Sequence, residues 1–162
     1  SLGQNVMITN FQEYFKLVEY FSEFTKARMG LAMGVYNLIQ IFDEKYYRHL
    51  SGGILESFGK LFYRDLKVYM YPYRDEEKNE FITSENLKVH PRMKELYKFF
   101  KNNGKLIDIS DFDQEIFHIF SRKVLKMITD GEEGWQEMLP EGVADTIVKK
   151  RLFGYSKTKK KL

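Results

Sequence analysis

The sequence lacks cysteine entirely and has only three prolines and one tryptophan among its 162 residues. Without cysteine, the chain can form no disulfide bond, no thiolate metal site and no cysteine nucleophile. No apolar run in the sequence approaches the ~20 residues that a membrane-spanning helix needs, and no signal peptide is visible. We therefore expect a cytoplasmic protein that does not associate with a membrane.

A large excess of one charge is also lacking. The net charge is +3, but Lys157, Lys159, Lys160 and Lys161 lie in the last six residues, and without them the chain is slightly negative. We expect residues 156–162 to form a basic disordered tail, because short charged termini are usually solvated. The tyrosines and phenylalanines are interleaved with carboxylates rather than with arginines, so we predict no nucleic-acid binding.

Apolar runs alternate with amphipathic segments through the first 75 residues. Runs typical of strands are residues 5–10, 28–34 and 66–73. Segments with apolar residues three and four positions apart, as in helices, are 11–25, 35–47 and 54–62. This alternation indicates parallel strands joined by crossover helices. We predict an α/β protein in which residues 1–75 form a Rossmann-like half, with a small, mainly parallel sheet of three or slightly more strands.

The pattern changes after residue 75. Residues 74–79 are charged and contain no apolar residue, which predicts a mobile loop, and we assign 76–90 to a loop or linker. Residues 92–101 have helical spacing, and 105–109 have the composition of a short strand. We predict that residues 91–155 form a mostly helical lobe.

The most specific pattern lies at residues 119–153. Apolar residues at helical spacing predict one helix here, which the Asp130-Gly131 pair ends. Pro140 suits the first turn of a second helix, where its missing N–H costs nothing. Two packed helices are therefore expected.

This stretch resembles the C-terminal end of the bacterial nicotinate-nucleotide adenylyltransferases, whose pattern is roughly ISSTxIR, a later Gly, and LPxxVxxYIxxxxLY. The matching positions are Ile119, Ser121, Val124, Gly131, Leu139, Pro140, Val143, Ile147, Leu152 and Phe153. The sequence departs from the family pattern at Phe120, Arg122 and Leu125, which stand where the family has Ser, Thr and Arg. The resemblance covers about a fifth of the chain.

The resemblance implies a bacterial nucleotidyltransferase-like protein of NAD biosynthesis that binds a nucleotide or another phosphorylated ligand, with ATP and Mg²⁺ as the implied cofactors. Family members bind nucleotide phosphates near the first of these helices, so Ser121, Arg122 and Lys126 are the phosphate-binding candidates here. The family's HxGH motif is absent from this sequence. The chain begins with Ser1 rather than Met, which we interpret as the start of a fragment. We expect no adenylyl transfer by this fragment alone and assign no catalytic residue.

The predicted strand ends supply further candidates, because open α/β sheets bind ligands outside the carboxyl ends of their strands. Thr9 and Asn10 follow the first predicted strand, and Gly34, Tyr36 and Asn37 follow the second. Helix capping by Thr9 or Asn10, and close helix packing at Gly34, are the structural alternatives.

A Gly-Gly turn offers another candidate site for an anion. Ser51, Gly52 and Gly53 precede a predicted helix, where backbone N–H groups can bind an anion. No GK[ST] follows, so the segment is not a P-loop, and an ordinary turn is the alternative.

The histidines and tyrosines carry the remaining expectations. Of the three histidines, His118 lies beside an apolar helical face and is interpreted as a packing residue. No histidine has the spacing of metal ligands, so we predict no metal site.

Alternation in LKVYMYPY places Tyr69, Tyr71 and Tyr73 on one face. The alternative to a nucleotide-binding protein is therefore a non-catalytic interaction module that forms a homodimer through this tyrosine-rich face.

Overall fold

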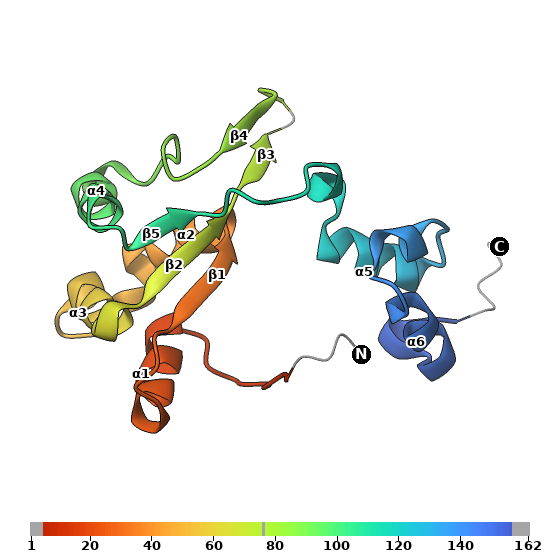
Figure 1. Cartoon of the computed structure of the whole chain (residues 1–162), viewed down its shortest axis with the longest axis horizontal. Helices are drawn as coiled ribbons and strands as arrows, with labels where there is room; N and C mark the ends of the chain where they lie inside the picture. The colour runs from red at the N-terminus through yellow and green to blue at the C-terminus, as the bar shows by residue number, and fades with distance from the viewer. Residues whose placement is uncertain (1–4, 76, 157–162) are drawn as a thin grey trace. The chain divides into compact units, whose positions relative to one another are not determined.

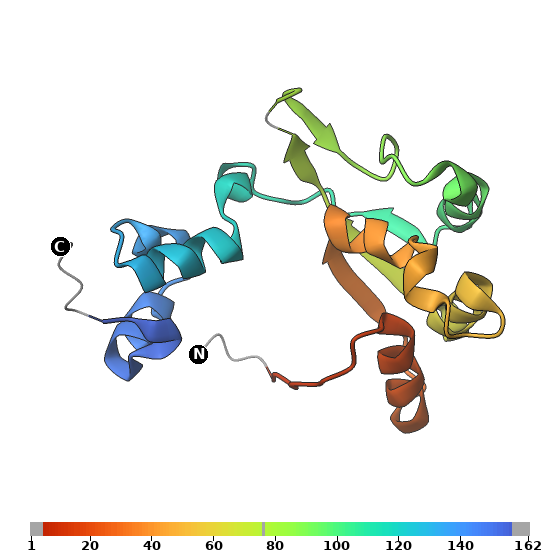
Figure 2. The same ribbon diagram turned by 180° about the vertical axis from the view of Figure 1, so that it is seen from behind.

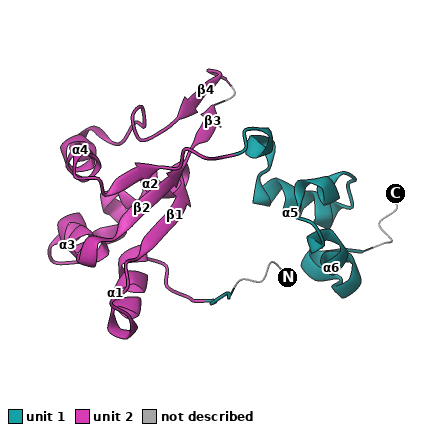
Figure 3. Cartoon of the chain, viewed as in Figure 1, with its two compact units in different colours: residues 1–8, 113–162 teal, residues 9–112 magenta. Residues whose placement is uncertain are grey.

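The computed structural model describes residues 5–75 and 77–156. The chain divides into two compact units, shown in Figure 3: unit 2 is Thr9–Phe112, and unit 1 is Ser1–Ile8 with Asp113–Leu162. No helix in the described residues is long and apolar enough to cross a membrane.

Unit 2 is built on a three-stranded parallel sheet. Its strands are β1 (Gly30–Gly34), β2 (Lys67–Tyr71) and β5 (Leu106–Asp108), in the order β1-β2-β5. The register pairs Leu31 with Val68, and Val68 with Leu106. The predicted α/β fold with a small, mainly parallel sheet is confirmed, and helical segments connect the parallel strands (Figure 1).

One face of this sheet carries the core of unit 2. The helices of this unit are α1 (Tyr14–Phe24), α2 (Val35–Ile41), α3 (Gly53–Leu61) and α4 (Lys94–Asn102). Helix α2 lies behind the sheet in Figure 1 and in front of it in Figure 2. Val68 and Met70 of β2 are fully buried in the core cluster, whereas Ala32 and Tyr69, on the opposite face, are exposed. Contacts among the rings of Phe58, Phe62 and Phe100 join α3 to α4; the Phe62 ring stacks on the other two.

Residues 5–10 correct the first sequence expectation, because they form no strand. Val6 and Ile8 are 83% and 94% exposed, and no sheet pairing is assigned to them. A strand needs a hydrogen-bonding partner, and an apolar run alone does not supply one. Thr9 and Asn10 therefore do not lie at a strand end.

The predicted division at residues 75 and 91 also differs from the structure. The strands β3 (Tyr73–Asp75) and β4 (Glu80–Ile82) pair antiparallel in a part of the chain for which we predicted a loop. Helix α4 and β5 belong to unit 2, because β5 pairs with β2 and completes the sheet. The helical lobe therefore begins at residue 113.

Unit 1 is the smaller unit and contains the predicted helix pair, α5 (Ser121–Asp130) and α6 (Val143–Lys150). Gly131 ends α5 at φ 74°, a left-handed conformation that glycine adopts without strain. The second helix begins at Val143, three residues later than Pro140. The buried residues of this core are Val124, Ile128, Trp135 and Ile147. Residues 157–162 of the predicted tail lie outside the described residues.

Short 3-10 helices complete the connections in both units. They are η1 (Glu44–Tyr47), η2 (Tyr63–Asp65), η3 (Pro91–Met93), η4 (Glu115–His118), η5 (Trp135–Met138) and η6 (Leu152–Gly154).

Candidate functional site

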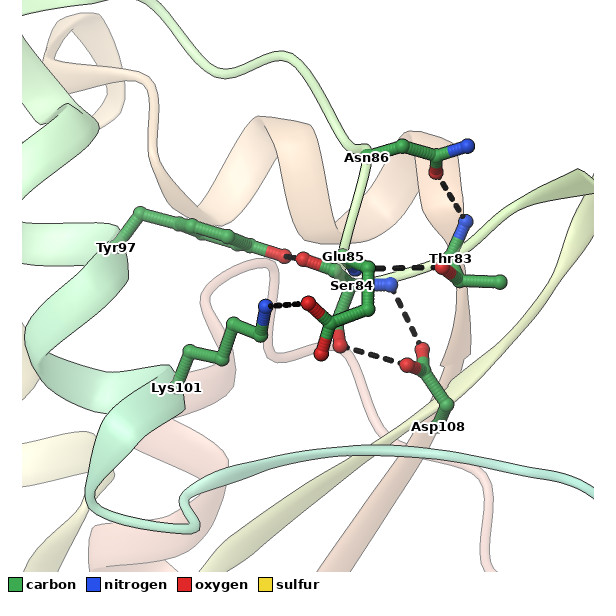
Figure 4. A network of polar contacts seen from close by, with 7 residues as sticks. All are labelled: Thr83, Ser84, Glu85, Asn86, Tyr97, Lys101 and Asp108. Carbon is green, nitrogen blue, oxygen red and sulfur yellow. Dashed lines mark hydrogen bonds and ion pairs between the residues drawn. The ribbon is translucent and has the colours of Figure 1, made fainter.

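A polar network surrounds the carboxyl end of β5 (Figure 4). Asp108, the last residue of β5, accepts hydrogen bonds from the backbone N–H of Ser84 at 2.8 Å and from its hydroxyl at 2.6 Å. Ser84 is only 4% exposed. A buried serine needs partners for both its N–H and its O–H groups, and the Asp108 carboxylate satisfies both.

Tyr97 of α4 also holds Ser84, through the backbone carbonyl of that residue. Its hydroxyl donates to the Ser84 carbonyl oxygen at 2.8 Å. Burial, followed by the negative charges of Asp108 and Glu85, raises the pKa of Tyr97 above its ordinary value. The phenol therefore stays protonated and keeps donating. The segment after β4 is thus attached both to the sheet and to α4.

The segment itself is a tight hydrogen-bonded turn. Thr83 N–H donates to the Asn86 side-chain oxygen at 2.8 Å, and Leu87 N–H donates to the Thr83 carbonyl at 3.0 Å. The Asn86 amide also donates to the Phe81 carbonyl at 2.9 Å. These bonds satisfy the backbone locally and give the turn a defined shape.

A cavity of about 510 Å³ lies between this turn and α4. Four lysines and one carboxylate, Glu85, are the charged residues of its wall; the lysines are Lys88, Lys94, Lys98 and Lys101. We call this cavity the lysine groove. Lys94, Lys98 and Lys101 are four and three positions apart on α4, so they share one helical face.

Only part of this positive charge is balanced within the chain. Lys101 forms an ion pair with Glu85, and Lys98 pairs with Glu95 at 2.9 Å. Lys88 and Lys94 form no ion pair with any residue that the structure describes. The groove therefore offers at least two ammonium groups to an anion. Tyr97 and Ser84, which also line the groove, are hydrogen-bonded to each other.

The candidates from the first 53 residues do not gather at one site. Thr9 and Asn10 lie in the exposed segment before α1. Gly34, Tyr36 and Asn37 do lie at the carboxyl end of β1, where they open α2. The Tyr36 ring contacts the Tyr73 ring, with centroids 5.3 Å apart.

The Gly-Gly turn at the start of α3 is already occupied by the chain itself. Gly52 N–H donates to the Glu56 carboxylate at 2.9 Å, and Gly53 N–H donates to the Leu50 carbonyl at 3.0 Å. The Gly52 hydrogen bond lowers the pKa of Glu56, as does neighbouring Lys60. Glu56 thus occupies one of the N–H donors that we predicted for a phosphate, whereas Arg48 and Arg92 line a cavity of about 540 Å³ beside the same turn.

Ser121, Arg122 and Lys126 lie in the first two turns of α5 in unit 1. All three are exposed, and Arg122 and Lys126 are four residues apart on one helical face. The helix has no side-chain cap and no acidic residue in its first turn. Positive side chains at this end oppose the helix dipole unless an anion is present.

Two side-chain expectations are corrected. His118 is exposed rather than packed, and its Nδ1 lies 2.7 Å from the Glu115 carbonyl oxygen. Tyr69 and Tyr71 share the outer face of β2, as predicted, and Tyr71 contacts the Phe112 ring. Tyr73 does not join them, because it packs against the core of unit 2. Pro72 separates β2 from β3 and breaks the alternation on which the prediction was based.

The lysine groove was missed from sequence. The spacing of Lys94, Lys98 and Lys101 within a predicted helix was a readable signal, but an exposed helical face usually carries such charges. The partnership of Ser84 with Asp108 joins residues 24 positions apart, which no local pattern reveals. In the described residues, no group of three or more His, Asp or Glu side chains is placed to bind a metal ion.

Comparison of the chain with protein-family models, curated proteins and solved structures found no match.

Proposed function

We propose that this α/β protein binds a phosphorylated small molecule, such as a nucleotide, in the lysine groove of unit 2. The observation that carries the proposal is the excess of lysines over carboxylates in the wall of one cavity. A phosphate group carries up to two negative charges and accepts several hydrogen bonds, so it suits converging ammonium groups.

The dimensions of the groove support a ligand of nucleotide size. Its volume of about 510 Å³ lies within the range of ~300–1,000 Å³ that is usual for small-molecule sites. It adjoins the carboxyl end of β5 through Ser84 and Asp108, and parallel sheets bind ligands near that edge. We thus propose the same class of ligand as the sequence suggested, but we place its binding site beside α4 rather than at Thr9 and Asn10.

The resemblance of residues 119–153 to the nicotinate-nucleotide adenylyltransferases adds a second reason to choose a nucleotide. Under this proposal the chain is part of a nucleotidyltransferase-like protein, and Ser121, Arg122 and Lys126 form a separate phosphate site within unit 1. ATP with Mg²⁺ is accordingly the first ligand to test.

Isothermal titration calorimetry with ATP, tripolyphosphate and adenosine tests the proposal. We expect ATP and tripolyphosphate to bind, adenosine not to bind, and affinity to fall as salt is raised. The double variant Lys88→Gln and Lys94→Gln should weaken ATP binding by about a hundredfold or more, because each charged hydrogen bond contributes ~1.5–3 kcal/mol. The matched control is Lys149→Gln with Lys150→Gln, at the end of α6.

The outcomes separate the possible sites. Loss of binding only in the variant of Lys88 and Lys94 supports the groove, and loss only in an Arg122→Gln variant moves the phosphate site to α5. Equal binding by all variants, or no binding of ATP at millimolar concentration, would refute nucleotide binding by these residues.

A second function is favoured by the outer face of the parallel sheet. Gly30, Ala32, Gly34 and Tyr69 are exposed there, whereas parallel sheets are usually covered on both faces. We propose as the alternative an interaction module that dimerises through this face. Sedimentation equilibrium of the chain and of Tyr69→Lys tests it, because a dimer that the substitution does not weaken cannot use this face.

A further inference from the structure

A second cavity in unit 2 is lined by tyrosines and by a carboxylate. It measures about 370 Å³ and lies between the start of α1 and the residues that follow α2. We call it the tyrosine pocket; its lining residues include Tyr14, Tyr46, Tyr47, Glu13 and Lys45. None of these residues belongs to the lysine groove, so the two cavities are separate sites.

Glu13 is the one carboxylate among the residues that line this pocket, whose wall also carries the ammonium group of Lys45. A hydrogen bond from Lys16 lowers the pKa of the Glu13 carboxyl, which therefore stays ionised at neutral pH. Lys16 Nζ and His49 Nε2 lie 2.9 Å and 3.7 Å from the same oxygen, Oε1. A carboxylate can accept about four hydrogen bonds, so Glu13 has capacity for a further donor.

The aromatic wall suits a positively charged nitrogen. Lys45 Nζ already lies 4.8 Å from the centroid of the Tyr46 ring, in cation–π contact, while Asp43 holds the same ammonium at 2.6 Å. Tyr47 is buried and hydrogen-bonded to Ser57, which fixes its ring at the side of the pocket. An electron-rich ring face beside a carboxylate is the usual recognition site for ammonium groups.

We propose that the tyrosine pocket binds an organic ammonium ion, with its nitrogen against Glu13 and the ring of Tyr46. The ligand is a primary or quaternary amine with a short apolar body, which fits the pocket volume. Lys45 and His49 also line the pocket, so an anionic ligand is a necessary control, and a neutral ligand of the same size lacks the charge that the proposal requires.

Titration of the ¹⁵N-labelled chain followed by ¹H–¹⁵N correlation NMR tests the proposal. The probes are n-butylamine and choline, with 1-butanol and butyrate as neutral and anionic controls of similar size. We expect saturable shifts of the amide signals of residues 12–14 and 45–49 with either ammonium and none with the controls. A further probe, N-acetyl-lysine amide, distinguishes a protein lysine side chain from a free amine as the source of the ammonium.

Two variants assign the contacts. Glu13→Gln should weaken butylamine binding about tenfold, the value expected for one charged hydrogen bond. Tyr46→Leu should weaken choline binding about threefold, as expected for an exposed cation–π contact. Glu19→Gln, on the same helix but outside the pocket, is the matched control and should bind as the parent chain does.

Three results would overturn the proposal. They are equal shifts with 1-butanol, unchanged affinity in Glu13→Gln, and no saturable shift with either ammonium. Dispersed spectra of each variant establish that it is folded, so a loss of binding is attributed to the pocket.

Discussion

Replacing Tyr97 by Phe removes one hydroxyl from the centre of the polar network and leaves the packing of the ring unchanged. The side chain is only 5% exposed, and its ring contacts that of Phe42 with centroids 5.2 Å apart. The substitution deletes the 2.8 Å hydrogen bond to the Ser84 carbonyl and leaves that carbonyl without this donor. We expect unit 2 to lose about 1–2 kcal/mol of its free energy of unfolding.

Urea denaturation measures this loss, and the positions of the aromatic residues allow the two units to be followed separately. The single tryptophan, Trp135, is buried in unit 1, so its fluorescence reports unfolding of that unit. Tyrosine fluorescence and far-ultraviolet circular dichroism include unit 2. With an m value of ~2 kcal/mol/M, the expected loss lowers the midpoint of the unit 2 transition by about 0.5–1 M urea.

The matched control is Tyr20→Phe. Tyr20 is 39% exposed and makes ring contacts that the substitution preserves, so its midpoint should stay within error. Hydrogen exchange should also accelerate at residues 84–87 in Tyr97→Phe, because α4 no longer holds the turn. If the unit 2 midpoint does not move, or if the tryptophan transition moves equally, the reasoning about this network is wrong.

Two further predictions concern pH and the core of unit 1. Burial raises the pKa of Tyr47 to about 12, whereas an unfolded tyrosine titrates near ~10. The free energy of unfolding should therefore be at its full value below pH 10 and fall as pH rises from 10 towards 12. Urea titrations from pH 8 to 11 check this, and Tyr47→Phe should reduce the slope. Ile147→Ala should cost about 2–4 kcal/mol in unit 1, because Ile147 is 3% exposed. Tryptophan fluorescence should then show an earlier transition, and an unchanged transition would contradict the assigned core.

Local sequence patterns correctly predicted those helices and strands of unit 2 that a short stretch of sequence determines. The spacing of apolar side chains found α1, α2 and α3, and the β-branched and aromatic run at residues 66–73 found β2. The same reasoning failed at residues 5–10, because an apolar run does not say whether a neighbouring strand is available. Whether a segment pairs is decided by the rest of the chain.

The position of β5 illustrates a second limit of prediction from local sequence, which is that distant segments pair. Its composition suggested a short strand, but the sequence could not show that it joins β2, across a connection that contains β3, β4 and α4. The boundary between the units was therefore predicted too early. The candidate site had the same limit, since Ser84 and Asp108 are brought together only when β5 takes its place in the sheet.

Three places in the chain are candidate anion sites: the start of α3, the start of α5 and the lysine groove. They differ in how far charges within the chain already neutralise them, which only the structure reveals. At the start of α3, Glu56 already accepts the Gly52 N–H group, so this donor is not available to an external anion. At the start of α5 and in the lysine groove, positive side chains exceed the carboxylates beside them. Opposite charges within the chain compete with an external anion for the same donors. Uncompensated positive charge, rather than an exposed helix end alone, is therefore the better guide to a phosphate site, and at the start of α3 that charge comes from Arg48 and Arg92, which line the same cavity as Ser51, Gly52 and Gly53.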